Sequence, residues 1–349
     1  MTTTTSDAQR ELPDEVVTQA HLRLVELPLA AGTAALVTLD NGMDHTRPST
    51  FGPAGLASLA AALDDVRARA ARGEVVAVML TGKPFVLAVG ADLSGVQAIR
   101  DRSQILEFVR LGHSVFGRVL DMGVPSFAFI NGAAMGGGLE LALHCTYRTV
   151  SAGAAAVSLP ECFLGLAPTW GGSQLLPALV GIDRAVTVVV ENPLDQNRQL
   201  KPAAVQDLGI ADVLLEPADF LESSIAWAAQ VLTGRVTVER PEVDRSAATW
   251  DAAIARGRAV ADMKTHGYAP APYRALDLLE LARTADLATG FAAEDDALAD
   301  LVMSDELRAG LYAFDLVQKR ARRPFGAPEA QLARPVTKVG IVGAGLMAG

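Results

Sequence analysis

Glu140 and the three glycines just before it are the part of this sequence best suited to chemistry. Gly136, Gly137 and Gly138 follow a strand-like run, Ser126–Ile130, and lead into a helical run that contains Glu140. Glycine permits positive φ angles and lets a ligand approach the backbone closely. The first N–H groups of a helix lack partners inside the helix and carry the positive end of its dipole. We therefore expect this turn to stabilise a negative charge.

An oxyanion suits this turn better than a phosphate. A phosphate-binding loop carries Lys and then Ser or Thr after its glycines, whereas Leu139 and Glu140 stand here. A carboxylate at that position would repel a phosphate, but it could transfer a proton beside an oxyanion that forms briefly on a carbonyl. Taken alone, the motif fits equally well a tight packing turn whose Glu satisfies the helix dipole.

A second turn, Gly90-Ala91-Asp92, ends an apolar segment that starts at Phe85. Gly90 permits an unusual backbone angle, and Asp92 is suited to cap a following helix. The amide of Ala91 would then point into a cleft. A simple strand-to-helix turn would explain the same residues.

Glu161 is the other candidate for acid–base chemistry. It lies in an apolar segment interrupted by proline and glycine, Leu159–Ser173, with few positive charges nearby in the sequence. Such a carboxyl group is either exposed on a loop or desolvated. Desolvation would raise its pKa and favour proton exchange near neutral pH.

The elements that must position these residues alternate between strands and helices. Strand-like runs occupy residues 21–27, 34–39 and 75–80, whereas residues 56–71 and 105–120 have the apolar spacing of amphipathic helices. This alternation predicts an α/β fold with helices packed on sheets. Beyond about residue 220, helical patterns dominate, at 224–232, 247–263, 273–284 and 294–319.

Composition excludes several classes of protein. The 30 Lys and Arg against 40 Asp and Glu give a net charge of −10, which disfavours binding to nucleic acid. No apolar stretch reaches the roughly 18 residues that a membrane helix needs. The two cysteines, Cys145 and Cys162, form neither a disulfide framework nor a metal motif. With no secretory signal at the N-terminus, we expect a soluble cytoplasmic protein that holds no metal.

Together the motifs resemble those of the enoyl-CoA hydratase/isomerase (crotonase) family, over roughly residues 25–220. Besides the two glycine turns, the resemblance rests on Pro160-Glu161, on Gly165-x-x-Pro168-x-x-Gly171-Gly172-Ser173 and on Leu208-Gly209-Ile210-Ala211-Asp212. It implies an α/β fold with a crotonase-like spiral core of ββα units and a helical C-terminal region.

The resemblance also implies roles for individual residues. The amides of Ala91 and Gly137 would form an oxyanion hole for a thioester oxygen. Glu140 would orient and deprotonate the attacking water, and Glu161 would protonate the α-carbon. The substrate-binding residues would be Gly90, Asp92, Gly136 and Lys83, with Lys83 a candidate contact for a CoA phosphate.

The partner implied is an enoyl-CoA thioester, with no organic cofactor, and family members lead us to expect a homo-oligomer, a trimer or a dimer of trimers. Three features depart from the family. The loop 41–55 is longer and richer in proline, one extra residue separates Glu140 from Glu161, and Glu191–Gln199 replaces a short threonine-glycine turn. They bear on chain length and CoA contacts rather than on the chemistry.

A narrower resemblance is to the N-terminal part of multifunctional fatty-acid β-oxidation enzymes, in which helices join a hydratase to a 3-hydroxyacyl-CoA dehydrogenase. Accordingly, we predict a flexible leader (1–20), a hydratase core (21–220), a helical linker (221–335) and a truncated dinucleotide-binding domain (336–349). Residues 338–348 resemble the first strand and G-x-G-x-x-A turn of such a domain. The following helix and strands that hold NAD are absent, so we expect a fragment that does not bind NAD.

Three functions follow from these observations. The first is a hydratase of 2-enoyl-CoA in fatty-acid β-oxidation, with enoyl-CoA isomerisation as a further activity of the same site. The second is a non-catalytic acyl-CoA-binding or assembly module, which the presence of both glutamates disfavours. The third, a dehydrogenase, would rest on the C-terminal motif alone.

Overall fold

The computed structural model describes residues 15–92 and 101–317, together with the single residues 326, 332, 334, 337, 338 and 340. The chain divides into two compact units, Met1–Gly310 and Leu311–Gly349. The second unit is described chiefly by residues 311–317. The glycine motif predicted at residues 343–348 lies outside the described residues.

The larger sheet contains six strands in the described part of the first unit. Their order is β1 (Gln19–Glu26), β2 (Thr33–Asp40), β3 (Ala77–Gly82), β5 (Ser126–Ile130), β7 (Tyr147–Ser151) and β9 (Val213–Leu215). Only β1 is antiparallel to its neighbour. Every residue of β3 and β5 is buried, as the continuous apolar sequence of parallel central strands requires.

A smaller parallel sheet positions the turns that carry the candidate chemistry. It consists of β4 (Val86–Ala88), β6 (Ala133–Met135) and β8 (Val157–Ser158), in that order. Parallel strands bring their carboxyl ends to the same edge, where ligands bind in open α/β sheets. After β4, β6 and β8 end at this edge, the chain continues into Gly90-Ala91, Gly136-Gly137 and Pro160-Glu161, respectively.

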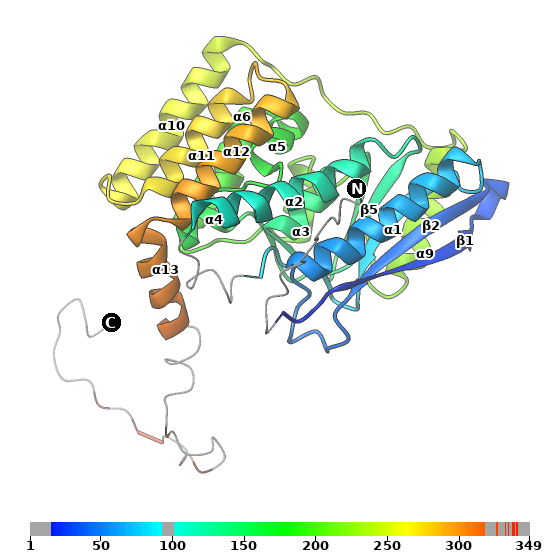
Figure 1. Cartoon of the computed structure of the whole chain (residues 1–349), viewed down its shortest axis with the longest axis horizontal. Coiled ribbons are helices and arrows are strands. Elements are labelled where there is room, and N and C mark those ends of the chain that lie inside the picture. The colour runs from blue at the N-terminus through cyan, green and yellow to red at the C-terminus, as the bar shows by residue number, and fades with distance from the viewer. Residues whose placement is uncertain are drawn as a thin grey trace, which may run out of the picture. The chain divides into compact units, whose positions relative to one another are not determined.

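Two long helices follow β2 and β4 in the chain and begin at clear signals. α1 (Pro53–Ala71) starts with proline, and the carboxylate of Glu15 accepts hydrogen bonds from the amides of Ala54 and Gly55 at 3.1 and 2.9 Å. α2 (Arg102–Leu120) starts where the Asp101 carboxylate accepts from an amide of its first turn. The two helices pack against each other (Figure 1).

Shorter helices follow β6 and β8 of the small sheet, before the C-terminal region. They are α3 (Gly137–Leu143), α4 (Glu161–Leu164), α5 (Gly172–Val180), α6 (Ile182–Val186), a π-helical turn (Thr187–Glu191), α7 (Asn192–Leu194) and α8 (Pro202–Asp207). A single 3₁₀ turn, Pro28–Ala30, joins β1 to β2.

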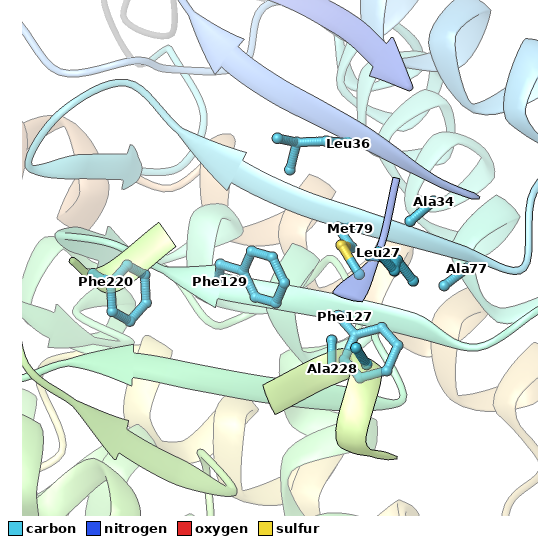
Figure 2. Close-up of a cluster of buried hydrophobic side chains, with 10 residues drawn as sticks. Leu27, Ala34, Leu36, Ala77, Met79, Phe127, Phe129, Phe220 and Ala228 are labelled. Carbon is cyan, nitrogen blue, oxygen red and sulfur yellow. The ribbon is translucent and has the colours of Figure 1, made fainter. Parts of the chain in front are cut away.

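The apolar core on one face of the larger sheet is closed by α9 (Phe220–Leu232). Figure 2 shows Phe127 of the sheet next to Ala228 of this helix, and Phe129, Leu36 and Phe220 belong to the same buried cluster. α9 thus completes the core of the sheet beyond residue 220, where we predicted the hydratase core to end, and it belongs to the same compact unit as the strands.

The C-terminal helices are α10 (Ala247–Thr265), α11 (Pro270–Leu281), α12 (Leu287–Val302) and α13 (Asp305–Asp315). The first three pack on α5, α6 and α2 (Figure 1). The single helix that we predicted over 294–319 is two helices, because the chain turns at Met303-Ser304. No helix in the described ranges is long and apolar enough to cross a membrane.

The predicted leader overlaps the folded unit. β1 begins at Gln19, Thr18 is buried and donates a hydrogen bond to the carbonyl of Thr50, and Glu15 binds the start of α1. Residues 15–20 are therefore part of the first unit, and residues 1–14 lie outside the described residues.

Candidate active site

One cavity in the first unit brings the predicted site residues together. Glu140, Glu161, Ala91, Gly137 and Gly90 all line it. Gly136 lines it as well. Three segments that are far apart in the sequence meet here because each follows a strand of the small parallel sheet.

The two predicted oxyanion-hole amides belong to neighbouring turns. The amide of Phe51 donates to the carbonyl of Gly90 at 2.9 Å, and Asp92 donates back to the carbonyl of Phe51 at 3.0 Å. Successive N–H groups of an extended segment point to opposite sides, so the amide of Ala91 points away from Phe51. Gly137 is the first residue of α3, where an amide has no partner inside the helix.

Glycine is required where these turns touch. Gly90 has a φ of +90°, and a Cβ on it would lie 3.3 Å from the amide nitrogen of Gly137. A Cβ on Gly136, whose φ is +52°, would lie 2.7 Å from Oε1 of Glu161. Side chains at either position would therefore separate the two turns or displace Glu161.

Glu140 is buried and firmly held. Its Oε1 accepts hydrogen bonds from the amides of Trp170 and Gly172 at 2.7 and 2.9 Å. Burial raises the pKa of Glu140 to about 7, and the charge of Glu294 adds to the rise, although the two amides and the charge of His113 oppose it. The carboxyl group therefore titrates near neutral pH.

Glu161 has a different environment at the first position of α4. Its Oε2 is shielded from solvent and has no hydrogen-bond partner in the described part of the chain. Burial, and then the charge of Glu140, raise the pKa of Glu161 well above its ordinary value. A protonated carboxyl group whose Oε2 has no partner, beside a cavity, is suited to donate a proton.

Apolar side chains form most of the remaining wall of the cavity. α2 contributes Ile105 and Phe108, and α12 contributes Leu298 and Val302. Leu164 ends α4, and Leu166 follows it. Trp170 lines the cavity too and is wedged between two glycines, because a Cβ on Gly112 would lie 2.2 Å from its Nε1 and a Cβ on Gly137 2.6 Å from its Cε3. The indole thus supports the turn that carries the Gly137 amide.

The sequence motifs missed a buried polar group behind Glu140. Glu294 is fully buried and bonds to the turn Gly171–Ser173, while His113 lies between Glu294 and Asp295. These residues lie on α2 and α12, which the motifs do not include. Their only local signal is a polar residue on the apolar face of a helix.

Lys83 does not serve the role that the resemblance implied. Its side chain is 3% exposed, and its ammonium donates to the side chain of Asn41 and to the carbonyls of Met43, Asp44 and Arg47. An ammonium group has three N–H donors, so Lys83 is fully used in holding the loop after β2. It is a structural residue and is not available to a CoA phosphate.

Asp92 is half-buried and follows Ala91 without lining the cavity. The helix that we expected it to cap would begin in residues 93–100, outside the described residues. Within the described ranges, no cluster of three or more His, Cys, Asp or Glu side chains could hold a metal.

Comparison with known proteins agrees with the family suggested by the motifs. Residues 13–265 match the family described as enoyl-CoA hydratase/isomerase. Two relatives named fatty acid oxidation complex subunit alpha, from Shewanella frigidimarina (strain NCIMB 400) and Shewanella loihica (strain ATCC BAA-1088 / PV-4), are each 30% identical. They cover 78% and 87% of this chain, but the chain covers only 38% and 42% of their lengths. The chain thus spans about two fifths of these relatives.

Solved structures confirm the predicted crotonase-like α/β fold. An enoyl-CoA hydratase from Bacillus halodurans is 17% identical, with a TM-score of 0.58 over 84% of this chain and 99% of its own. The human mitochondrial delta3-delta2-enoyl-CoA isomerase is 16% identical, with a TM-score of 0.59 over 87% of this chain and 99% of its own. At such identities the likeness concerns the fold alone.

Proposed function

Since the chain belongs to the enoyl-CoA hydratase/isomerase family, we propose that it adds water across the 2,3 double bond of 2-enoyl-CoA thioesters. The relatives' name supports a place in fatty-acid oxidation. In this proposal the cavity holds the acyl group, with its thioester carbonyl between the two turns.

The thioester oxygen accepts hydrogen bonds from the amides of Ala91 and Gly137. These donors matter most as the reaction proceeds, because attack at C3 moves negative charge onto that oxygen. Fixed donors at such a position are worth about 10²–10³ in rate each. The dipole of α3 contributes in the same direction, since Gly137 is its first residue.

The two glutamates divide the proton transfers. Glu140, held through Oε1, accepts a proton from water with Oε2, and the water oxygen forms a bond to C3. The electron pair of the double bond moves toward the thioester, and C2 then takes a proton from Glu161. A proton passes from Glu140 to Glu161 through the next water to restore the starting state.

One observation carries this assignment: the buried carboxyl group of Glu140, which accepts two amide hydrogen bonds, and the half-buried Glu161, whose shielded Oε2 accepts none, line the same cavity as two backbone amides. An acyl-CoA-binding module would need the apolar wall and the amides. It would not need a pair of carboxyl groups with raised pKa values, which are costly to bury.

Isomerisation of 3-enoyl-CoA to 2-enoyl-CoA is a second candidate activity. It requires the same amides and a single group that removes a proton from C2 and returns one to C4. Glu161, whose Oε1 lies beside Gly136 and whose Oε2 has no partner among the described residues, is suited to that role. We further propose that the chain functions as a homo-oligomer, by its resemblance to the family.

The test is loss of the absorbance of the conjugated enoyl thioester when the protein is added to crotonyl-CoA without NAD. Mass spectrometry should find a product heavier by one water, and the double variant Glu140→Gln/Glu161→Gln is the control. A binding module would leave the absorbance unchanged. If folded protein turns over neither crotonyl-CoA nor longer 2-enoyl-CoA substrates, the proposal is wrong.

A further inference from the structure

We propose that His113 and Glu294 are positioning residues: this buried ion pair, from α2 and α12, fixes the turn whose amides hold Glu140. The inference rests on the proposed function, because it concerns the base of that reaction. Neither residue lines the cavity, so neither touches the substrate.

Glu294 uses both of its oxygens to bind one turn. Its Oε2 accepts from the amide of Gly171 at 2.7 Å, and its Oε1 accepts from the amide and the hydroxyl of Ser173 at 3.1 and 2.5 Å. The side chain is 0% exposed. A carboxylate has about four acceptor sites. Glu294 therefore supplies the hydrogen bonds that the amides of Gly171 and Ser173 and the Ser173 hydroxyl would otherwise make with water.

Alternate amides of the same turn bind Glu140 instead of Glu294. Trp170 and Gly172 donate to Oε1 of Glu140, whereas Gly171 and Ser173 donate to Glu294. The turn from residue 170 to residue 173 is therefore held between two carboxylates. A displacement of Glu294 would rotate the peptide groups that fix Glu140.

His113 contacts Glu294 and forms an ion pair with it. Its Nε2 lies 2.9 Å from Glu294 and its Nδ1 2.8 Å from Asp295, so both nitrogens donate in the imidazolium form. Burial lowers the pKa of His113, but these hydrogen bonds outweigh it, and the pKa rises to about 9. The ring also stacks on Phe291 at 4.5 Å.

The other titratable groups around the pair are Arg110, His144 and Glu140. Arg110 lies 3.4 Å from the second oxygen of Asp295, which balances that carboxylate. Burial lowers the pKa of His144 to about 4, so His144 is neutral near pH 7. Glu140 is then the ionisable group that faces both charges, with Glu294 raising its pKa and His113 lowering it.

The same helix face also reaches the cavity. Glu294, Leu298 and Val302 are spaced by four residues, which places them on one side of α12. Leu298 and Val302 line the cavity while Glu294 holds the turn behind it. The helix therefore links the wall of the acyl pocket to the position of the base.

Two variants of the full chain test the proposal through the pH profile of crotonyl-CoA hydration. Glu294→Gln keeps the shape of the side chain but places its NH₂ group against the amide donors of the turn. We expect kcat to fall about 10²-fold, the cost typical of a displaced reacting group. KM should stay within about threefold of the wild-type value. Since a negative charge is lost, the acidic limb of kcat/KM should move to lower pH. His113→Gln should also lower kcat, but with that limb moved to higher pH.

Two further variants separate positioning from loss of stability. Thr149→Val removes the buried hydrogen bond to Ser224 far from the turn, so it should lower Tm without changing kcat or the pH limb. Ser173→Ala removes the hydroxyl hydrogen bond to Glu294 and replaces Glu294→Gln in the test if that variant does not fold. It should lower kcat less than Glu294→Gln does and leave the acidic limb of the pH profile unchanged. Wild-type kcat in both Ser173→Ala and Glu294→Gln, or limb shifts of the same sign in the two charge variants, would overturn the proposal.

A measurement without substrate keeps this inference distinct from the proposed function. The ¹³C carboxyl signal of Glu140, assigned by its loss in Glu140→Gln, should titrate at lower pH in Glu294→Gln and at higher pH in His113→Gln. If the wild type turns out not to hydrate enoyl-CoA, the proposed function fails, but these opposite shifts would still support the positioning role. Unchanged titration would refute it.

Discussion

Glu140 and Glu161 are the same residue type at the edge of the same cavity, yet their surroundings are opposite. Glu140 lies in α3, and one of its oxygens accepts two amide hydrogen bonds from the turn that follows α4. Glu161 begins α4, and its Oε2 has no partner among the described residues. The difference teaches that, of two desolvated carboxyl groups, the one with amide donors is the candidate base and the other the candidate acid.

The physical reason is that an amide donor stabilises the charged form of a carboxyl group, whereas an apolar wall stabilises the neutral form. Both groups are desolvated, so both pKa values rise, but the donors and His113 limit the rise for Glu140. Two carboxyl groups with different pKa values can hold one proton between them at neutral pH, which is the state that the proposed reaction needs.

The largest effect should come from replacing either carboxyl group by its amide. Glu140→Gln and Glu161→Gln should each lower kcat by about 10²–10⁴, the usual contribution of a proton-transfer group. The double variant should be little worse than either single one, because the two groups act in one sequence of transfers. Stopped-flow and steady-state assays with crotonyl-CoA measure this. Additive losses would indicate that the two groups act independently, and wild-type turnover in either variant would refute its role.

Alanine variants sharpen the comparison in stability. Glu140→Ala leaves two buried amides without an acceptor, at about 1–3 kcal/mol for each in the free energy of unfolding. Glu161→Ala removes a carboxyl group that has no partner for Oε2, so we expect no loss of stability or a small gain. Urea denaturation of the two variants measures the difference. Equal destabilisation would contradict the contrast in hydrogen bonding.

The pH dependence is the subtlest test. The proposed base must be ionised and the proposed acid protonated, so kcat/KM should rise with pH through about 7, where Glu140 titrates, and fall at higher pH as Glu161 loses its proton. Raised pKa values mean that the folded state binds protons more tightly than the unfolded chain. The stability contributed by the two groups is therefore present below their ordinary pKa of 4.5 and lost as pH rises through the raised values.

Glu140→Gln removes one of these titrations and serves as the matched control. The free energy of unfolding should then change less between pH 4.5 and 7 than in the wild type. A variant whose stability keeps the wild-type dependence on pH would show that Glu140 is not the group that titrates there.

Much of the fold and the central part of the site could be predicted from the sequence. The Gly136–Gly138 turn before Glu140, the Gly90-Ala91 turn and Pro160-Glu161 carry local instructions, because φ preferences and helix starts depend on adjacent residues. The strands and helices predicted between residues 21 and 130 begin and end within three residues of those in the structure, whereas β7, β9 and the helices from α4 to α8 were not predicted. We predicted one helix over 294–319 where the structure has two, because its apolar pattern continues across the break at Met303-Ser304.

The roles of His113, Glu294 and Lys83 were decided by tertiary structure. His113 and Glu294 are 181 residues apart, and nothing local indicates that α12 packs on α2. Lys83 resembles a surface cation in the sequence, but the loop after β2 folds over its ammonium. Local sequence determined which groups could react, whereas the packing of distant elements decided which charges are paired and hence which groups remain available for chemistry.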